Sequence, residues 1–318
     1  MPLSSASIFA ATVPVFAIVA LGLILRRRGS LAPEADRSIL FLTITLTYPA
    51  YILRKILGDP ALHDFANIWI PAACGVGFML LGMGISWLVG PLFGLKNRKE
   101  RGTFAVACSV QNYGYIPIPI LAVLFPDHGW AGILFVYTLG IELVMWTVGM
   151  MLISGSARGA ARHLLNPVVL SIVIGVTLNL LNLDEYVPQW FGKLMEMLGN
   201  CSFPLGLMMF GIALADLLKE PGWHREWRTP VGAVILRLAL LPATMIFITL
   251  WLAPGDHFRH IVAVQASMPA AMFPLVMAKR YGGDEPTAMR VILFTTIVSF
   301  ATIPFVVQAA LKWLGVGS

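Results

Sequence analysis

Charged residues are scarce in this sequence. Asp, Glu, Lys and Arg make up 12% of the 318 residues, and hydrophobic residues make up 58%. A typical soluble domain carries about 25% charged residues, so the composition predicts an integral membrane protein surrounded by the lipid bilayer. The formal net charge of +6 does not indicate a nucleic-acid partner, because most Lys and Arg residues lie in short loops beside apolar segments.

Cysteine and metal-ligand patterns are also lacking. Cys74, Cys108 and Cys201 fall in apolar segments without CxxC spacing, so we expect small buried side chains rather than a disulfide framework or a metal site. The histidines lie in loops or at segment ends without zinc-ligand spacing, so no metal or cofactor is expected. The apolar segments hold neither paired acidic motifs nor a Ser/His pair, so an enzyme is not predicted. No basic region precedes the first segment, so no cleavable signal peptide is expected.

Long apolar segments fill the rest of the sequence. Each is close to the ~20 residues that a helix needs to cross a bilayer. Prolines (21) and glycines (29) fall largely inside these runs, which favours a bundle with broken helices over a barrel. We therefore predict an all-α membrane protein with ten transmembrane helices, at about 7–26, 38–57, 66–90, 101–125, 129–153, 164–183, 187–217, 230–252, 258–281 and 286–311.

The distribution of basic residues predicts the orientation. Fifteen Lys and Arg residues lie in one set of loops, and the opposite side holds only Arg54, Lys55, Lys193, Arg259 and Lys312. By the positive-inside rule, both termini face away from the cytoplasm. With five spans in each half, the second half enters the membrane in the opposite sense. This predicts two inverted repeats, residues 1–155 and 156–318.

Internal similarity supports the repeat. The motif at residues 46–50 (LTYPA) resembles that at 201–205 (CSFPL), at an offset of about 155 residues, which aligns Pro49 with Pro204. The same offset aligns Pro119 with Pro274. Pro49 and Pro204 could kink helices toward a substrate path, although a purely structural role is preferred.

The fourth and ninth spans each contain residues that interrupt a helix. Glycine and proline are costly at membrane depth unless the unwound backbone lines a cavity or is buried against protein. Two interrupted spans at matching positions predict a transporter site. We expect the substrate site at Gln111, Asn112, Tyr113, Gly114, Tyr115, Ser267, Met268, Pro269, Ala270 and Ala271, with breaks at Pro117, Pro119 and Pro274.

The chemistry expected at these breaks suits a carboxylate. Each half-helix that starts after a break directs about +0.5 charge into the gap. Pro117 fits the first turn of such a half-helix, and Ala270 and Ala271 offer backbone amides with little side-chain bulk. Gln111, Asn112, Gln265 and Ser267 supply neutral donors and acceptors. The alternative is that the prolines only kink packed helices.

Glu142 is the only acidic residue deep within a span, and Arg237 and Arg290 are basic residues within spans. Glu142, in the fifth span, is a candidate proton carrier or cation ligand, and the alternative is a structural pair with Arg237 in the eighth span. Arg237 could hold a second carboxylate, or it could extend to the membrane interface beside Arg228. We expect the latter.

Several motifs, in order and spacing, resemble the auxin efflux carrier family. They are VPV at 13–15 with LG at 21–22 and RRRG at 26–29, LTYPA at 46–50, QNYGYIP at 111–117, ASMPA at 266–270 and KRYGGD at 279–284. The resemblance implies a five-plus-five inverted repeat related to bile-acid sodium symporters, with crossed fourth and ninth helices. It also implies an elevator motion of spans 3–5 and 8–10 against a scaffold of spans 1, 2, 6 and 7, which would form a homodimer.

The resemblance also suggests a function. Bacterial members look like inner-membrane carriers of small organic anions such as malonate and malate. The related sodium symporters place a glutamate at the crossing, where this sequence has Gln265, so sodium coupling is less favoured. We predict a carboxylate transporter that is coupled to protons through Glu142 or works as a uniporter. A sodium symporter and a channel are the alternatives.

Overall fold

The computed structural model describes residues 5–126, 129–156, 160–220 and 226–316. These residues are helical apart from turns, loops and one isolated backbone bridge, which confirms the all-α prediction. The α-helices are α1 (Ser5–Arg27), α2 (Pro33–Leu42), α3 (Tyr48–Ile56), α4 (Ala66–Val89), α5 (Arg98–Ser109), α6 (Pro117–Leu124), α7 (Trp130–Val144), α8 (Met150–Ser154), α9 (Ala160–Leu164), α10 (Pro167–Leu180), α11 (Gln189–Asn200), α12 (Ser202–Leu217), α13 (Arg228–Ile235), α14 (Leu241–Leu252), α15 (Asp256–Ala266), α16 (Phe273–Tyr281) and α17 (Glu285–Trp313).

Three long helices each contain one π-helical turn. The turns are η1 (Thr43–Thr47) between α2 and α3, η4 (Met145–Gly149) between α7 and α8, and η6 (Leu236–Leu240) between α13 and α14. Pro49 and Pro242 are the second residues of α3 and α14, which follow η1 and η6. Proline lacks the amide donor and its ring pushes on the carbonyl one turn earlier, so the hydrogen-bond ladder widens there.

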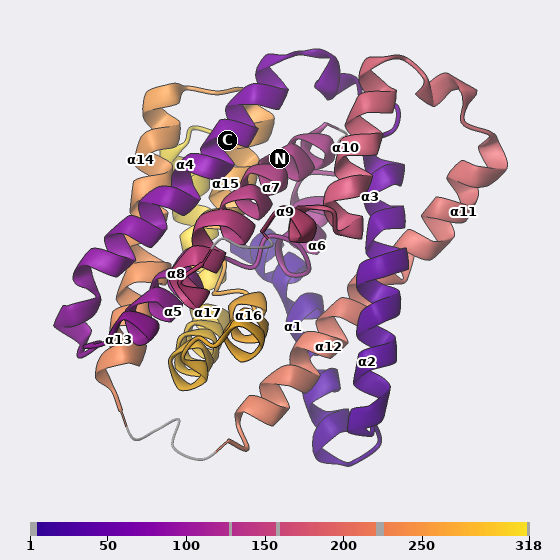
Figure 1. The fold of residues 1–318 in the computed structure, drawn as a ribbon. Coiled ribbons are helices and arrows are strands. Elements are labelled where there is room, and N and C mark those ends of the chain that lie inside the picture. Colours follow the sequence, from indigo (N-terminus) through magenta and orange to yellow (C-terminus); the bar gives the residue numbers. More distant parts are fainter. Residues whose placement is uncertain (1–4, 127–128, 157–159, 221–225, 317–318) are drawn as a thin grey trace.

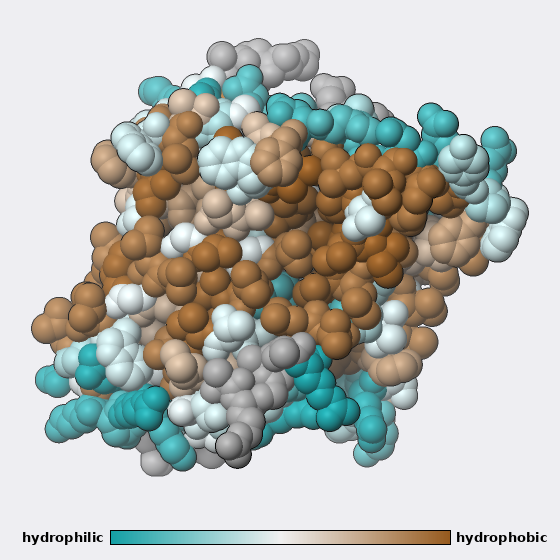
Figure 2. Space-filling model, turned by 45° about the horizontal axis from the view of Figure 1, so that its top comes forward, coloured by the Kyte–Doolittle hydropathy of each residue, from teal (hydrophilic) through white to brown (hydrophobic). Residues whose placement is uncertain are grey.

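The length and composition of the helices fit a membrane. Within the described residues, seven helices, counted through such turns, are long and apolar enough to cross a bilayer, and α10 is a shorter apolar helix. Figure 2 shows a broad hydrophobic band between two hydrophilic ends. Large apolar side chains such as Phe247 (70% exposed) and Trp251 (78%) point outward, which is favourable only against lipid.

The helices form two groups (Figure 1). In one, α1 packs on α12, and α3 packs on α10 and α11. In the other, α4 packs on α5 and α7, while α17 packs on α5, α13 and α15. The groups touch where α3 meets α7 and where α1 meets α6 and α17. Both ends of the chain lie at the same end of the bundle (Figure 1).

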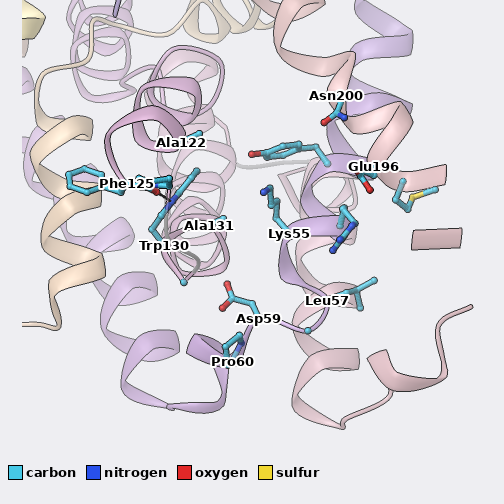
Figure 3. Close-up of a pocket in the computed structure, with 16 residues that line it drawn as sticks. Lys55, Leu57, Asp59, Pro60, Ala122, Phe125, Trp130, Ala131, Glu196 and Asn200 are labelled. Atoms are coloured by element: carbon cyan, nitrogen blue, oxygen red, sulfur yellow. Dashed lines mark hydrogen bonds between the residues drawn. The ribbon is translucent and has the colours of Figure 1, made fainter. Parts of the chain in front are cut away.

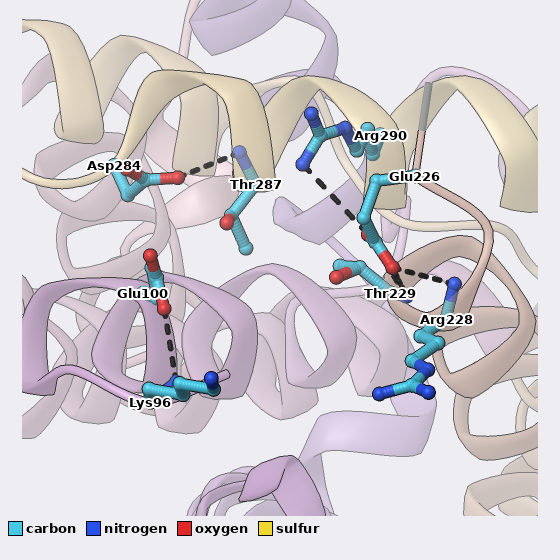
Figure 4. Close-up of polar contacts among 8 residues, drawn as sticks. All are labelled: Lys96, Glu100, Glu226, Arg228, Thr229, Asp284, Thr287 and Arg290. Carbon is cyan, nitrogen blue, oxygen red and sulfur yellow. Dashed lines mark hydrogen bonds and ion pairs between the residues drawn. The ribbon is translucent and has the colours of Figure 1, made fainter. Parts of the chain in front are cut away.

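The opposite end of the bundle is fixed by helix caps (Figure 4). The Glu100 carboxylate accepts hydrogen bonds from the backbone amides of Lys96 (3.0 Å) and of Asn97 (3.4 Å), and the second of these is half of a capping box on α5. Asp284 caps α17. Glu226 accepts from the first amides of α13 and forms an ion pair with Arg290 (3.8 Å). Three helices of one group therefore begin at this end in defined positions.

One cysteine departs from the sequence expectation. Cys74 and Cys108 are buried, but Cys201 is exposed. It lies at the turn between α11 and α12. An apolar residue on the outside of a membrane helix faces lipid rather than water, so hydrophobicity alone did not require burial.

Glycine allows α1 and α12 to approach closely. A Cβ atom placed on Gly211 would lie 1.9 Å from the Val19 carbonyl oxygen, and one on Gly22 would lie 2.2 Å from the Met208 carbonyl oxygen. The two backbones therefore touch without an intervening side chain, as in other small-residue helix pairs in membranes.

We expect Gly211→Ala to lower the melting temperature of the detergent-purified protein. The methyl group must push two backbones apart, and overpacking of this kind costs roughly 1–3 kcal/mol. Gly192→Ala in α11 is the control, because its added Cβ meets nothing within 4 Å. A Gly211→Ala variant that melts with the native protein would contradict the close packing.

Candidate functional site

The segments predicted as the fourth and ninth spans are each divided into two helices. The chain leaves α5 after Ser109 and becomes helical again at Pro117, and it leaves α15 after Ala266 and becomes helical again at Phe273. Pro117 is the first residue of α6 and Pro274 the second of α16. Proline is favourable there because the first helical amides have no partner within the helix. Pro119 lies inside the first turn of α6 rather than at its break.

The two breaks lie against each other. The Asn112 amide donates to the Pro269 carbonyl (2.8 Å), and the Ala271 amide donates to the Val110 carbonyl (2.8 Å). Gln111 and Ala270 form an antiparallel bridge between them. The unwound backbone groups thus satisfy one another away from water, as buried irregular backbone must. We call this contact the crossing, meaning residues 110–116 and 267–272.

The expectation for Ala270 and Ala271 was wrong. Their amides are not free for a ligand, because the Ala270 amide donates to Thr295 Oγ1 (3.2 Å) and the Ala271 amide bonds to the opposite break. The second half-helix begins two residues later, at Phe273. Buried amides had to find partners within the protein, and the two neighbouring segments supply them.

The polar side chains predicted at the site do come together. Gln111 Nε2 donates to the Tyr137 hydroxyl (2.8 Å), and Gln265 Nε2 donates to the Tyr113 carbonyl (3.1 Å). Asn112 Oδ1 lies 3.4 Å from the Ile116 amide, just before α6. Most of the predicted residues are buried, and Tyr113 and Tyr115 are intermediate. The remaining buried members are Gly114, Ser267, Met268, Pro269, Ala270 and Ala271.

Several polar atoms near the crossing lack a partner. The Tyr48 hydroxyl and Gln265 Oε1 are buried, and neither has a hydrogen bond within the described residues. A Cβ atom placed on Gly114 would lie 2.7 Å from the Tyr48 hydroxyl, so this phenol reaches the break. An unsatisfied buried polar group costs about 1–3 kcal/mol, and such groups are typical of sites that receive a ligand or water.

Tyr48 was not among the predicted site residues. It comes from α3, in the other helix group, and its ring lies 5.3 Å from that of Tyr115. Tyr115 in turn packs on α12, where a Cβ on Gly206 would lie 2.1 Å from the ring. The sequence signal for Tyr48 was its position beside Pro49, in a motif repeated as Phe203-Pro204. Both prolines thus lie next to aromatic residues that contact the crossing.

Glu142 connects to the crossing through Tyr113. The Tyr113 hydroxyl donates to Glu142 Oε1 (2.6 Å), and Trp146 Nε1 (2.9 Å) and Asn166 Nδ2 (3.4 Å) donate to Oε2. Glu142 is 5% exposed, and three hydrogen-bond donors surround its carboxyl group. The alternative pairing with Arg237 is wrong, because none of the ion pairs among the described residues joins the two.

The Glu142 network continues toward the capped end. Asn166 also donates to the His163 carbonyl (3.0 Å), and His163 Nε2 lies 3.0 Å from the Tyr281 hydroxyl. Partial burial lowers the pKa of His163, and the nearby Arg280 and Arg162 lower it further. The imidazole is therefore mostly neutral at pH 7, and it can accept or donate a hydrogen bond at this position.

Arg237 does not extend to the membrane interface. It is 1% exposed, and its Nη1 lies 3.5 Å from the Cys108 carbonyl, 3.4 Å from the Ser109 carbonyl and 3.4 Å from Gln111 Oε1. These carbonyls end α5, where the helix dipole leaves about −0.5 charge. The broken helix thus offers a buried negative end that attracts the guanidinium inward. Within the described residues, no group of three or more His, Cys, Asp or Glu side chains is placed to hold a metal ion.

These features define a helical membrane protein with a buried polar centre between two broken spans. The family model described as "Membrane transport protein" matches residues 7–162 and 157–307. The chain belongs to this family of membrane transport proteins, which confirms the resemblance to the auxin efflux carriers.

Three similar proteins cover almost the whole chain. An "Uncharacterized transporter" of Methanothermobacter thermautotrophicus is 26% identical over 298 residues, which is 91% of this chain and 94% of that protein. An "Uncharacterized transporter" of Methanocaldococcus jannaschii is 22% identical over the same shares. A protein of Rhizobium meliloti named "Putative malonate transporter" is 23% identical over 94% of both chains.

Proposed function

We propose that this protein is a secondary transporter of small organic anions, namely mono- or dicarboxylates such as malonate or malate. The observation that carries the proposal is the backbone contact between the two breaks, beside which the Tyr48 hydroxyl and Gln265 Oε1 have no partner. The name of the Rhizobium relative motivates malonate as the first substrate to test.

The crossing is the proposed substrate site. The Tyr48 hydroxyl is a free donor for a carboxylate oxygen, and the Arg237 guanidinium adds a buried positive charge behind Gln111. Asn112 and Ser267 are the neutral polar groups proposed to orient the substrate. The start of α6 at Pro117 contributes the positive end of a helix dipole.

The proposed mechanism is alternating access by an elevator motion. We propose ten membrane spans, made up of the seven long helices, α10 and the two interrupted pairs α5–α6 and α15–α16, and we assign them to inverted repeats 1–155 and 156–318. The group with α1, α2, α3, α10, α11 and α12 is the proposed scaffold, and the other group is the transport domain. Both breaks belong to the transport domain and are hydrogen-bonded together, so a substrate would move with one body.

We propose that the proton gradient drives transport, with Glu142 as the proton carrier. If the transporter is not coupled to protons, the gradient of the anion itself drives it. Sodium sites in transporters use unwound carbonyls and half-helix C-termini. Here Arg237 lies against those oxygens at α5, and the neutral Gln265 stands at the other break. A sodium symporter remains the alternative, and sodium dependence of uptake is its test.

The proposed location is the bacterial inner membrane, with both termini in the periplasm and a homodimer formed through the scaffold. Both chain ends lie opposite the end of the bundle that carries Lys96, Arg228 and Arg290 (Figures 1 and 4). Since the positive-inside rule puts such loops in the cytoplasm, this arrangement supports the orientation.

We expect Asn112→Ala to reduce malonate counterflow in proteoliposomes by at least about tenfold, the effect of one lost hydrogen bond to a charged group. The protein should remain folded, because the backbone bonds of residue 112 stay. Asn67→Ala, whose side chain bonds to the Ala61 carbonyl away from the crossing, is the control. Native uptake by Asn112→Ala would contradict the site, and non-saturable flux would indicate a channel.

A further inference from the structure

A cavity of about 650 Å³ opens between the two helix groups at the end of the bundle where α3 finishes. The end of α3 and α11 form one wall, and the end of α6 and the start of α7 form the other. Figure 3 shows Lys55 and Asp59 reaching into it from one side, with Phe125 and Trp130 on the other. The cavity has the size of a small-molecule site.

The two cations of this cavity form no ion pair among the described residues. Arg54 and Lys55 line it, and neither takes part in the ion pairs found among the described residues. The Asp59 carboxylate is already engaged, because it accepts from the amides of Gly132 (3.1 Å) and Ala61 (3.0 Å). Glu196 also lines the cavity, and it pairs with Lys193 (3.3 Å), which does not. Two positive charges are therefore available to an anion.

One cavity at the opposite end, of about 590 Å³, differs in this respect. It is lined by Lys279 and Arg290 together with Glu220, Asp284 and Glu285. Lys279 pairs with Glu285 (3.9 Å), and Arg290 pairs with Glu226 (3.8 Å). Each cation of this second cavity has a carboxylate partner. We therefore expect this cavity to attract an anion less strongly than the first cavity does.

One face of α3 runs from the cavity between α3 and α7 to the crossing. Lys55 lies over the Tyr51 ring (5.7 Å from nitrogen to centroid), and Tyr51 packs edge-on against Phe203 (4.6 Å). One turn deeper, Tyr48 reaches Gly114 in the break. An aromatic layer of Tyr51, Phe203 and Tyr115 thus separates the cavity from the proposed substrate site.

We propose that this cavity is an access site for the transported carboxylate, where Arg54 and Lys55 bind the anion before the aromatic layer opens. The inference rests on the proposed function. Each cation lies on the route but outside the crossing. Removing it should therefore weaken capture of the anion from solution without changing the steps that follow.

Kinetics of reconstituted protein test the role in transport. For Arg54→Gln/Lys55→Gln we expect the KM for malonate to rise about tenfold, with kcat unchanged and a weaker dependence on ionic strength. Lys312→Gln is the control and should behave as native, because Lys312 is an exposed cation near the end of α17 that does not line the cavity. An unchanged KM would overturn the proposal. So would an effect seen only in vesicles that contain phosphatidylglycerol and not in pure phosphatidylcholine, because it would assign the cations to lipid headgroups.

Thiol labelling tests the cavity without requiring transport. In a Cys201→Ser background, Asn200→Cys places a reporter on the cavity wall, while Cys74 and Cys108 stay buried. We expect an anionic methanethiosulfonate to label it about tenfold faster than a cationic one, malonate to slow the labelling, and the double Gln variant to lose both effects. Equal rates in native and variant would overturn the access site. Intact charge preference with no malonate transport would instead refute the proposed function alone.

Discussion

Glu142→Gln is expected to abolish malonate accumulation driven by an imposed pH gradient. The amide keeps the size of the side chain and can still bond to Trp146 and Asn166, but it cannot carry a proton. One pH unit is worth about 1.4 kcal/mol per proton, so the native transporter should accumulate malonate about tenfold per coupled proton. The variant should only equilibrate it. Exchange of malonate at fixed pH should persist, because that reaction moves no net charge.

The control is Glu185→Gln, an exposed carboxylate away from the crossing. Accumulation by Glu142→Gln at the native level would show that the carboxyl group is not the proton carrier, and would favour uniport. Loss of exchange together with a lower melting temperature would assign Glu142 a structural role through Tyr113 and Asn166.

Arg237→Gln should reduce malonate transport by about 100-fold. A buried cation about 6 Å from a carboxylate contributes about 2.8 kcal/mol at an effective dielectric of 20, which corresponds to that factor. Folding should be little affected, because the variant loses weak bonds to the α5 carbonyls but also avoids burying a charge without a carboxylate partner. Arg237→Lys keeps the charge and should retain measurable transport.

Sodium dependence gives Arg237 a second test. If the guanidinium stands where a bound cation would otherwise lie, Arg237→Gln should become stimulated by sodium, while the native protein is not. Native-like transport by Arg237→Gln in sodium-free buffer would show that the charge serves neither the substrate nor the broken helix.

Much of the helical structure could be predicted because membrane helices follow simple rules. Apolar length identified the long spans, and the prolines at 117 and 274 marked the breaks, since proline removes donors that a continuous helix needs. The π-helical turns could not be predicted. Met145–Gly149 contains no proline, so its hydrogen-bond register is set by packing rather than by local sequence.

The positions of the two helix breaks were predictable, but the contacts made there were not. Residues such as Gln111 and Gln265 were predicted as site residues because polar side chains are costly at membrane depth and usually have a function there. Which partner each would take depended on the fold. The carbonyls that hold Arg237 belong to a helix about 130 positions earlier in the chain, and Tyr48 comes from the opposite helix group. Neither contact could be predicted from the sequence, because the contacting residues lie far apart along the chain.

The joint between the two breaks is made from main-chain atoms, which every amino acid possesses. Only a proline at Asn112 or Ala271 would remove one of its donors. The frame that holds a cargo can therefore survive extensive replacement of the residues around it, as expected in a family whose members here share only 22–26% identity. Sequence divergence would then change the side chains that face the substrate. The same backbone contact could therefore serve transporters of chemically different substrates in different lineages.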